Sequence, residues 1–252
     1  MNLSLRFMIR YLRVTRHVLR MVIGKNEIMH VVIFAGGTLR PGKAFYAAIG
    51  SADMFIAADS GAETALKYGC TPRIVVGDFD SLDASVLEEL GKRGSQVRRV
   101  AVEKDETDTE LAVQVAIEEG ATRITLAGAI GGVRFDHTMA NILLLAGFEG
   151  VPITIVDGPS MGWLVRGPGS SAIDGQVGDL VSLLPLTGDA SGVRTKGLYY
   201  ALEGETLSFG KPRGVSNVLI EEHAEVSVEG GELLVIYTNM QELSALEHIT
   251  HS

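Results

Sequence analysis

The sequence predicts an α/β fold, with a parallel-sheet N-terminal domain followed by a smaller all-β sandwich domain. Between residues 31 and 157, short β-branched runs alternate with helical stretches, which is typical of a parallel sheet covered by helices. After residue 158, frequent glycines separate short apolar runs, as in a sandwich of short strands. Hydrophobic residues make up 46% of the 252 residues, which is enough to fill packed cores.

The expected elements follow from these runs in chain order. In the first part we expect strands at residues 31–34, 54–57, 73–76, 97–102, 123–127 and 151–156, and helices at 44–49, 62–68, 84–92, 109–119 and 138–147. In the second part we expect strands at 180–184, 198–202, 218–220, 224–228 and 233–237. The tail after residue 237 has no clear pattern.

The chain divides into three segments, 1–28, 29–157 and 158–252. Residues 1–25 carry five arginines and one lysine at helical spacing, and no Asp or Glu, so we expect a basic amphipathic helix. It is a targeting or membrane-surface segment, a helix docked on the body, or an extension upstream of a true start at Met21 or Met29. We favour the extension, because the folded pattern begins cleanly at His30.

The net charge and the cysteine content exclude some classes of function and indicate a cellular compartment. A formal net charge of -9 argues against a nucleic-acid-binding surface, which relies on clustered Lys and Arg. The longest apolar run is shorter than the roughly 20 residues that span a bilayer, so no membrane partner is expected. Cys70 is the only cysteine, which excludes an intramolecular disulfide and favours a cytoplasmic protein.

Two acidic turns predict a metal site. Asp78 and Asp80 follow the strand at 73–76, and Asp105 and Asp108 follow the strand at 97–102. The carboxyl ends of parallel strands line one crevice, so the four carboxylates are expected to meet there. Carboxylates repel a polyphosphate unless a divalent cation lies between them, and Mg²⁺ prefers such hard oxygen ligands. We therefore predict that these aspartates hold Mg²⁺ and are catalytic. Alternatively, they cap helices.

Further turns at the same strand ends are candidates for phosphate binding. Glycines let the backbone approach an anion, and an arginine can grip phosphate oxygens. Each turn alone is also consistent with ordinary turn geometry. His137 could simply cap a helix, and Lys104 could simply be a solvent-exposed side chain beside the acidic residues. The candidates are Gly36, Gly37, Asp59, Ser60, Lys104, Arg134 and His137. No dinucleotide-binding GxGxxG or P-loop motif follows any predicted strand.

In the second domain, the segment Arg213, Ser216 and Asn217 attracts attention. A Ser-Asn pair after a glycine turn can donate and accept hydrogen bonds to a small heteroaromatic ring. The same residues are also typical of any β-turn, and chemistry alone does not decide between the two.

Six motifs follow one another along the chain: GDFDS at 77–81, KDETDTE at 104–110, GGVRFDHTMAN at 131–141, SLLPL at 182–186, GLYYAL at 197–202 and GVSN at 214–217. In this order they resemble the motifs of thiamine pyrophosphokinase of the bacterial type. The resemblance covers nearly all of residues 31–237. It implies an α/β catalytic domain joined to a thiamine-binding β-sandwich, working as a homodimer with thiamine near the interface.

The resemblance also implies an activity and roles for residues. It implies Mg²⁺-dependent transfer of a pyrophosphoryl group from ATP to the thiamine hydroxyl, which gives thiamine diphosphate and AMP. The family's usual motif is GGRxDH, and this chain has an extra Val133 before its arginine. The direction of the Arg134 side chain therefore does not follow from the motif. The implied roles are magnesium ligation for Asp78, Asp80, Asp105 and Asp108, nucleotide binding for Arg134, Asp136 and His137, and thiamine binding for Ser216 and Asn217.

Two alternatives stay open. The first is a pyrophosphokinase with the same acidic site that acts on another heterocyclic alcohol, such as a hydroxymethylpterin. The second is a nucleotide or thiamine sensor without turnover, which the number of carboxylates disfavours.

Overall fold

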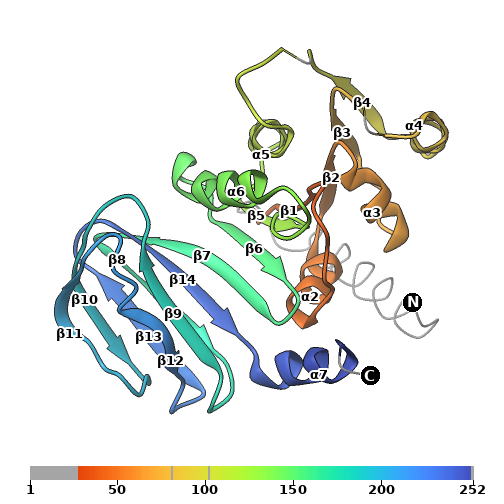
Figure 1. Cartoon of the computed structure of the whole chain (residues 1–252). Helices are drawn as coiled ribbons and strands as arrows, with labels where there is room; N and C mark the ends of the chain where they lie inside the picture. The colour runs from red at the N-terminus through yellow and green to blue at the C-terminus, as the bar shows by residue number, and fades with distance from the viewer. Residues whose placement is uncertain (1–27, 81, 102, 251–252) are drawn as a thin grey trace, which may run out of the picture. The chain divides into compact units, whose positions relative to one another are not determined.

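The computed structural model describes residues 28–80, 82–101 and 103–250, and these form two compact units (Figure 1). Unit 1 comprises the chain up to Ile142 together with Gly150–Asp157, and unit 2 comprises Leu143–Glu149 and the chain from Gly158 onward. The basic segment at residues 1–27 lies outside the described residues. In the described part of the chain, no helix is both long and apolar enough to cross a membrane.

Unit 1 is built on a parallel sheet in the order β6-β5-β1-β2-β3-β4, so the predicted α/β class is confirmed. Two predicted elements have the observed bounds, and most others differ by one to three residues at an end. The strands are β1 (His30–Phe34), β2 (Met54–Ala58), β3 (Ile74–Gly77), β4 (Gln96–Arg99), β5 (Arg123–Ala127) and β6 (Ile153–Asp157). The helices are α2 (Lys43–Ser51), α3 (Gly61–Lys67), α4 (Ala84–Lys92), α5 (Asp108–Glu118) and α6 (Phe135–Gly147).

Burial explains the strand order. Every residue of β1, β2 and β3 is buried, as expected for apolar strands inside a parallel sheet. By contrast, β4 has the polar sequence QVRR, is mostly exposed and lies at the edge, where charged side chains discourage pairing with another chain.

Local capping sets the starts of two helices of unit 1. Asp83 accepts a hydrogen bond from the Ser85 N–H (2.9 Å) at the start of α4. Thr107 accepts one from the Glu110 N–H (3.2 Å) at the start of α5, the first half of a capping box. The chain is therefore turned into α5 directly after the second acidic motif.

Unit 2 is a β-sandwich, as predicted, with a C-terminal helix added. One sheet has the order β12-β9-β14-β7 and the other β11-β10-β13-β8. Apolar side chains from both sheets, such as Val181, Val235, Val193 and Val226, form one buried core. The elements are β7 (Ser160–Arg166), β8 (Gly169–Asp174), β9 (Leu180–Pro185), β10 (Ala190–Lys196), β11 (Glu203–Leu207), β12 (Gly214–Val218), β13 (His223–Val228), β14 (Glu232–Thr238) and α7 (Met240–Thr250).

The strand predicted at residues 198–202 is wrong. Leu198 makes only an isolated bridge to Leu219, and the chain turns at Tyr199 and Tyr200, whose rings are exposed. Gly197, with φ 72°, starts this turn, because a left-handed residue breaks the extended path of β10.

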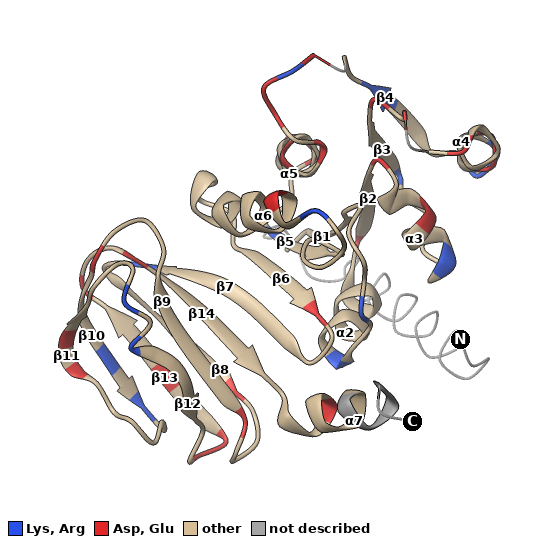
Figure 2. Ribbon diagram, viewed as in Figure 1, with Lys and Arg blue, Asp and Glu red and all other residues tan. Residues whose placement is uncertain are grey.

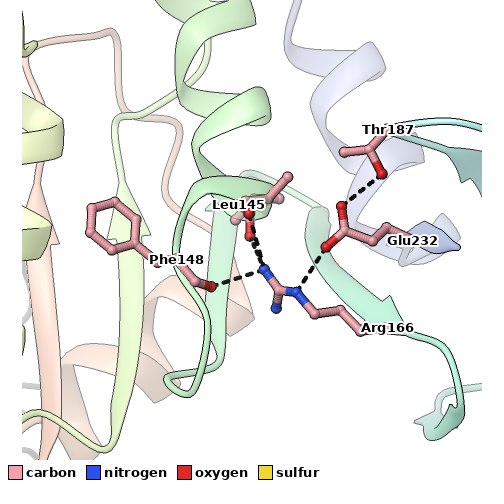
Figure 3. Close-up of polar contacts among 6 residues, drawn as sticks. Leu145, Phe148, Arg166, Thr187 and Glu232 are labelled. Atoms are coloured by element: carbon pink, nitrogen blue, oxygen red, sulfur yellow. Dashed lines mark hydrogen bonds and ion pairs between the residues drawn. The ribbon is translucent and has the colours of Figure 1, made fainter.

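Two polar networks hold unit 2 together. Arg166 on β7 donates to the carbonyl oxygens of Leu145 and Phe148 at the end of α6 (both 2.8 Å) and pairs with Glu232 (2.9 Å) (Figure 3). A guanidinium at this position satisfies carbonyls that a helix end leaves without partners and complements the helix dipole. Asp179, 2% exposed, forms the second network, which ties β9 to β14 and α7.

Candidate functional site

A cavity of ≈ 370 Å³ lies at the carboxyl ends of the parallel strands of unit 1. The connection from β1 leads to β2 on one side, and the connection from the neighbouring strand β5 leads to β6 on the other side. The gap between the ends of β1 and β5 is therefore the switch point where open α/β sheets bind ligands. The loops after β1, β2 and β5 and the first turn of α5 line the cavity. Among the predicted residues, the lining includes Gly36, Gly37, Asp59, Ser60, Asp108, Arg134 and His137.

Two glycine-bearing loops form one wall of the cavity. The Gly37 N–H donates to the carbonyl oxygen of Gly128 (2.9 Å), which joins the loop after β1 to the loop after β5. A Cβ at Gly37 would lie 2.5 Å from that same carbonyl oxygen, so no larger residue fits without a backbone shift. Asn141 on α6, 6% exposed, donates to the Ala129 carbonyl oxygen (2.6 Å) and holds the second loop.

An acidic group adjoins the cavity. Carboxylate oxygens of Asp59, Asp78 and Asp80 all lie within 4.8 Å of one another. Asp59 also lines the cavity, so it belongs to both features. Two residues of these turns have left-handed backbones without being glycine: Asp59 (φ 44°) and Phe79 (φ 61°). Such conformations are disfavoured and gather at functional sites, where the surrounding structure enforces them.

Mutual repulsion acts within this group. The pKa of the Asp80 carboxyl is raised, chiefly by the negative charge of Asp78, then by desolvation and by Asp59, with a smaller effect from Asp108. Hard oxygen ligands gathered this closely match the ligand preference of Mg²⁺, and a divalent cation neutralises their repulsion. The residues present therefore fit the predicted metal.

The second acidic turn is only partly brought to the site. Asp108 lines the cavity and pairs with Lys104 (2.5 Å), so the predicted phosphate ligand Lys104 faces a carboxylate in this structure. Asp105 is exposed in the loop before α5 and belongs neither to the three-carboxylate group nor to the cavity lining. Figure 2 shows further acidic residues along this loop and on α5.

The segment after β5 contributes a cation. Arg134 lines the cavity and is gripped by both carboxylate oxygens of Asp136 (2.6 Å between Nη2 and Oδ2). The Arg134 guanidinium holds the pKa of Asp136 far below its usual range. The extra Val133 is fully exposed and itself lines the cavity, and Arg134 after it lines the same cavity.

In unit 2, a separate cavity of ≈ 390 Å³ is lined by Arg213 and Asn217, but not by Ser216. The Asn217 side chain is 6% exposed and bonded to backbone: its Oδ1 accepts from the N–H groups of Tyr200 and Val218 (both 2.9 Å), and its Nδ2 donates to the Tyr200 carbonyl (2.7 Å). Ser216 is exposed with φ 59°. Asn217 thus fixes the turn that presents Tyr200.

Sequence reasoning missed several residues of the site. Thr38, Thr107 and Asn141 also line the first cavity, and Arg99 contacts the first acidic turn. Thr107 had a detectable signal, since Thr-x-x-Glu before a helix is a capping box. Arg99 had none, because its importance depends on which residue lies opposite it in β3.

Comparison with known proteins agrees with this geometry. Residues 45–156 match the family description "Thiamin pyrophosphokinase, catalytic domain", and residues 172–233 match "Thiamin pyrophosphokinase, vitamin B1 binding domain". The chain belongs to the thiamin pyrophosphokinase family. The first matched region contains the acidic group and all of the cavity lining except Gly36, Gly37 and Thr38, and the second contains most of the β-sandwich.

Individual relatives give the same result. The chain is 29% identical over 188 residues to thiamine pyrophosphokinase of Bacillus subtilis (strain 168), covering 73% of this chain and 86% of that protein. The crystal structure of the B. subtilis enzyme has a TM-score of 0.74, covering 84% of this chain and 99% of that one. Thiamin pyrophosphokinase from Geobacillus thermodenitrificans is 31% identical with a TM-score of 0.72, covering 84% and 98%.

Proposed function

We propose that this protein is a Mg²⁺-dependent thiamine pyrophosphokinase, which transfers a pyrophosphoryl group from ATP to the hydroxyl of thiamine. The observation that carries the proposal is Asp59, which belongs both to the three-carboxylate group and to the lining of the cavity at the switch point. A nucleotide in that cavity would have its phosphates beside the acidic group, which would hold a divalent ion that neutralises their charge.

The nucleotide would bind through unit 1. The loop containing Gly36 and Gly37 and the segment with Arg134 and His137 offer backbone and cationic donors to the triphosphate. Arg134 is held by Asp136 and would transfer its hydrogen bonds to phosphate when ATP enters. Lys104 would do the same on leaving Asp108.

In the reaction, the thiamine hydroxyl oxygen attacks the β-phosphorus of ATP, and the bond from that phosphorus to the oxygen of AMP breaks. When bound, Mg²⁺ supplies charge neutralisation for the phosphates. Asp78, Asp80 and Asp59 would hold it. Catalysis is then mostly positioning, because the transferred group needs alignment more than covalent help. A carboxylate that is not a metal ligand, with Asp105 and Asp108 as the candidates, would accept the hydroxyl proton.

Unit 2 would bind thiamine. We assign the contacts to Arg213 and Ser216 and to the exposed ring of Tyr200, which Asn217 holds in place. This changes the predicted role of Asn217 from a direct ligand to a residue that shapes the site.

We also propose that the protein is a cytoplasmic homodimer. Phe135 and Met139 on α6 and the Tyr199–Tyr200 pair of unit 2 are exposed apolar side chains of the kind that a subunit interface covers. The single cysteine, Cys70, is buried and not in a disulfide, in keeping with a reducing compartment. Light scattering at micromolar concentration measures the oligomeric state, and a monomer would contradict the dimer.

The test of the function is product formation from ATP in the presence of Mg²⁺ and either thiamine or a hydroxymethylpterin. The proposal expects AMP and thiamine diphosphate in equal amounts with thiamine, and no AMP with the pterin. AMP with the pterin alone would replace the substrate assignment. Binding of thiamine and ATP with no AMP would identify a sensor.

A further inference from the structure

Arg99 lies beside the first acidic turn although it is distant from it in sequence. It is the last residue of the edge strand β4 and pairs in register with Gly77, the last residue of β3. Because β3 leads directly into the turn, the Arg99 side chain reaches it. Its Nη1 donates to the carbonyl oxygen of Asp78 (2.8 Å), and its guanidinium carbon lies 5.2 Å from the centre of the Phe79 ring.

The turn that Arg99 contacts is under two kinds of stress. Phe79 has a left-handed backbone (φ 61°), which a residue with a Cβ disfavours. On either side of it, Asp78 and Asp80 point carboxylates toward Asp59 within 4.8 Å, and like charges at that distance repel. A hydrogen bond within the turn, from the Asp80 N–H to the Asp78 Oδ1 (3.1 Å), holds the two residues together against this repulsion.

We propose that Arg99 is a positioning residue for the metal site, a role that rests on the proposed function. One donor fixes the Asp78 carbonyl, and stacking fixes the Phe79 ring, which is 7% exposed. The Asp78 carbonyl belongs to the peptide group that joins Asp78 to Phe79, and the ring belongs to the residue that follows, so together the two contacts set the orientation of that peptide group. The positive charge of Arg99 also lowers the negative potential of the turn. Arg99 itself is not among the metal ligands.

The neighbouring Arg98 provides a matched control. It is on the same strand and carries the same charge, but it pairs with Glu118 (3.4 Å), the last residue of α5, and with Glu119 (2.7 Å) just after it. Among the described residues, its side chain has no hydrogen bond or ion pair with the turn. Replacing either arginine with methionine removes one positive charge from β4 and keeps a long apolar stem. A difference between the two variants therefore reports on the contact with the turn.

The experiment measures Mn²⁺ binding by electron paramagnetic resonance in the presence of a non-hydrolysable ATP analogue, and so requires no turnover. Residues that orient metal ligands typically change metal affinity about 10- to 100-fold when they are replaced. We expect R99M to raise the dissociation constant for Mn²⁺ about tenfold. R98M should stay within about twofold of the wild type, the range of a surface ion pair. Thermal unfolding in EDTA should be alike for both variants.

Two further variants separate charge from geometry. R99K keeps the charge but loses the planar fork and its stacking, so it should recover only part of the affinity. F79L removes the ring and keeps the apolar volume, and adding it to R99M should weaken binding less than the two single changes together predict, since both break the same contact. Full recovery in R99K would overturn the positioning role in favour of charge alone.

Other outcomes also decide. Wild-type affinity in R99M, or equal losses in R98M and R99M, overturns the role of Arg99 while leaving the metal site in place. Absence of Mn²⁺ binding in the wild type contradicts both the metal assignment and the role of Arg99. Mn²⁺ binding without AMP formation from thiamine contradicts the proposed function alone.

Discussion

Replacing Asp80 with asparagine should stabilise the metal-free protein and at the same time abolish its turnover. The pKa of Asp80 is raised, first by the charge of Asp78, so its ionised form is disfavoured in the folded state. A carboxyl whose pKa is raised by folding contributes favourably to folded-state stability below its unfolded pKa, and this contribution is lost as the pH rises through its folded pKa. At neutral pH the wild type carries the repulsion, and Asp80→Asn removes it.

The size of the expected loss in ligand-induced stability follows from the linkage between ligand binding and folding. A metal–nucleotide complex at about 100 times its dissociation constant stabilises the wild type by about 2.7 kcal/mol. For a protein of this size that is a rise in Tm of about 5–11 °C. Asp80→Asn should lose most of this rise in Tm, because it removes one of the three carboxylates whose oxygens lie within 4.8 Å of one another. Turnover should fall at least about 100-fold, as for other preorganised charged groups.

Scanning fluorimetry in EDTA, and then in Mg²⁺ with a non-hydrolysable ATP analogue, measures both effects, and AMP release gives turnover. Asp174→Asn is the control, since Asp174 is an exposed aspartate of unit 2 that pairs with His223. It changes the net charge equally and should leave the ligand-induced rise intact. Near-normal turnover in Asp80→Asn, or an undiminished rise, would refute the metal assignment.

Three further changes test the packing around the site and in unit 2. Gly37→Ala places a Cβ 2.5 Å from a facing carbonyl and should weaken binding of the ATP analogue at least about tenfold by calorimetry. The control Gly50→Ala, with open space around it, should be neutral or slightly stabilising. Arg166→Met should lower the free energy of unfolding in urea by about 2 kcal/mol, because two carbonyls and a glutamate lose their donor; an unchanged midpoint would contradict that role. Burial would raise the pKa of Asp179, but hydrogen bonds from Tyr237 and from backbone N–H groups outweigh burial and lower that pKa. The ionised Asp179 therefore stabilises the folded protein above the unfolded pKa, and this stabilisation is lost as the pH falls through the folded pKa. Asp179→Asn should cost about 2–3 kcal/mol at pH 7 and much less near pH 2, and an equal cost at both would contradict it.

The sequence predicted unit 1 well because its strands are continuous apolar runs. The segment at 123–127 and the helix at 84–92 have the observed bounds, since burial and helix capping both mark their ends. Unit 2 was harder. β7 contains Gly162 and β8 begins at Gly169, so glycines that resemble turns lie inside strands. The sandwich class was still predictable, because turn residues recur throughout.

For the site, the sequence predicted which strand ends carry acids but not where each side chain lies. Asp59 was assigned to the nucleotide, yet it completes the three-carboxylate group. Asp105 was assigned to the metal, yet it is exposed and lies outside that group, because the chain turns into α5 only at Thr107. Arg99 was missed because its contact depends on the register between β3 and β4, which no local pattern encodes.

The most direct test of the account is a crystal structure with Mg²⁺, a non-hydrolysable ATP analogue and thiamine. We expect an ion about 2.1 Å from oxygens of at least two of Asp59, Asp78 and Asp80, with the triphosphate in the cavity lined by Gly37 and Arg134. An ion held without these carboxylates, or a triphosphate outside this cavity, would contradict it.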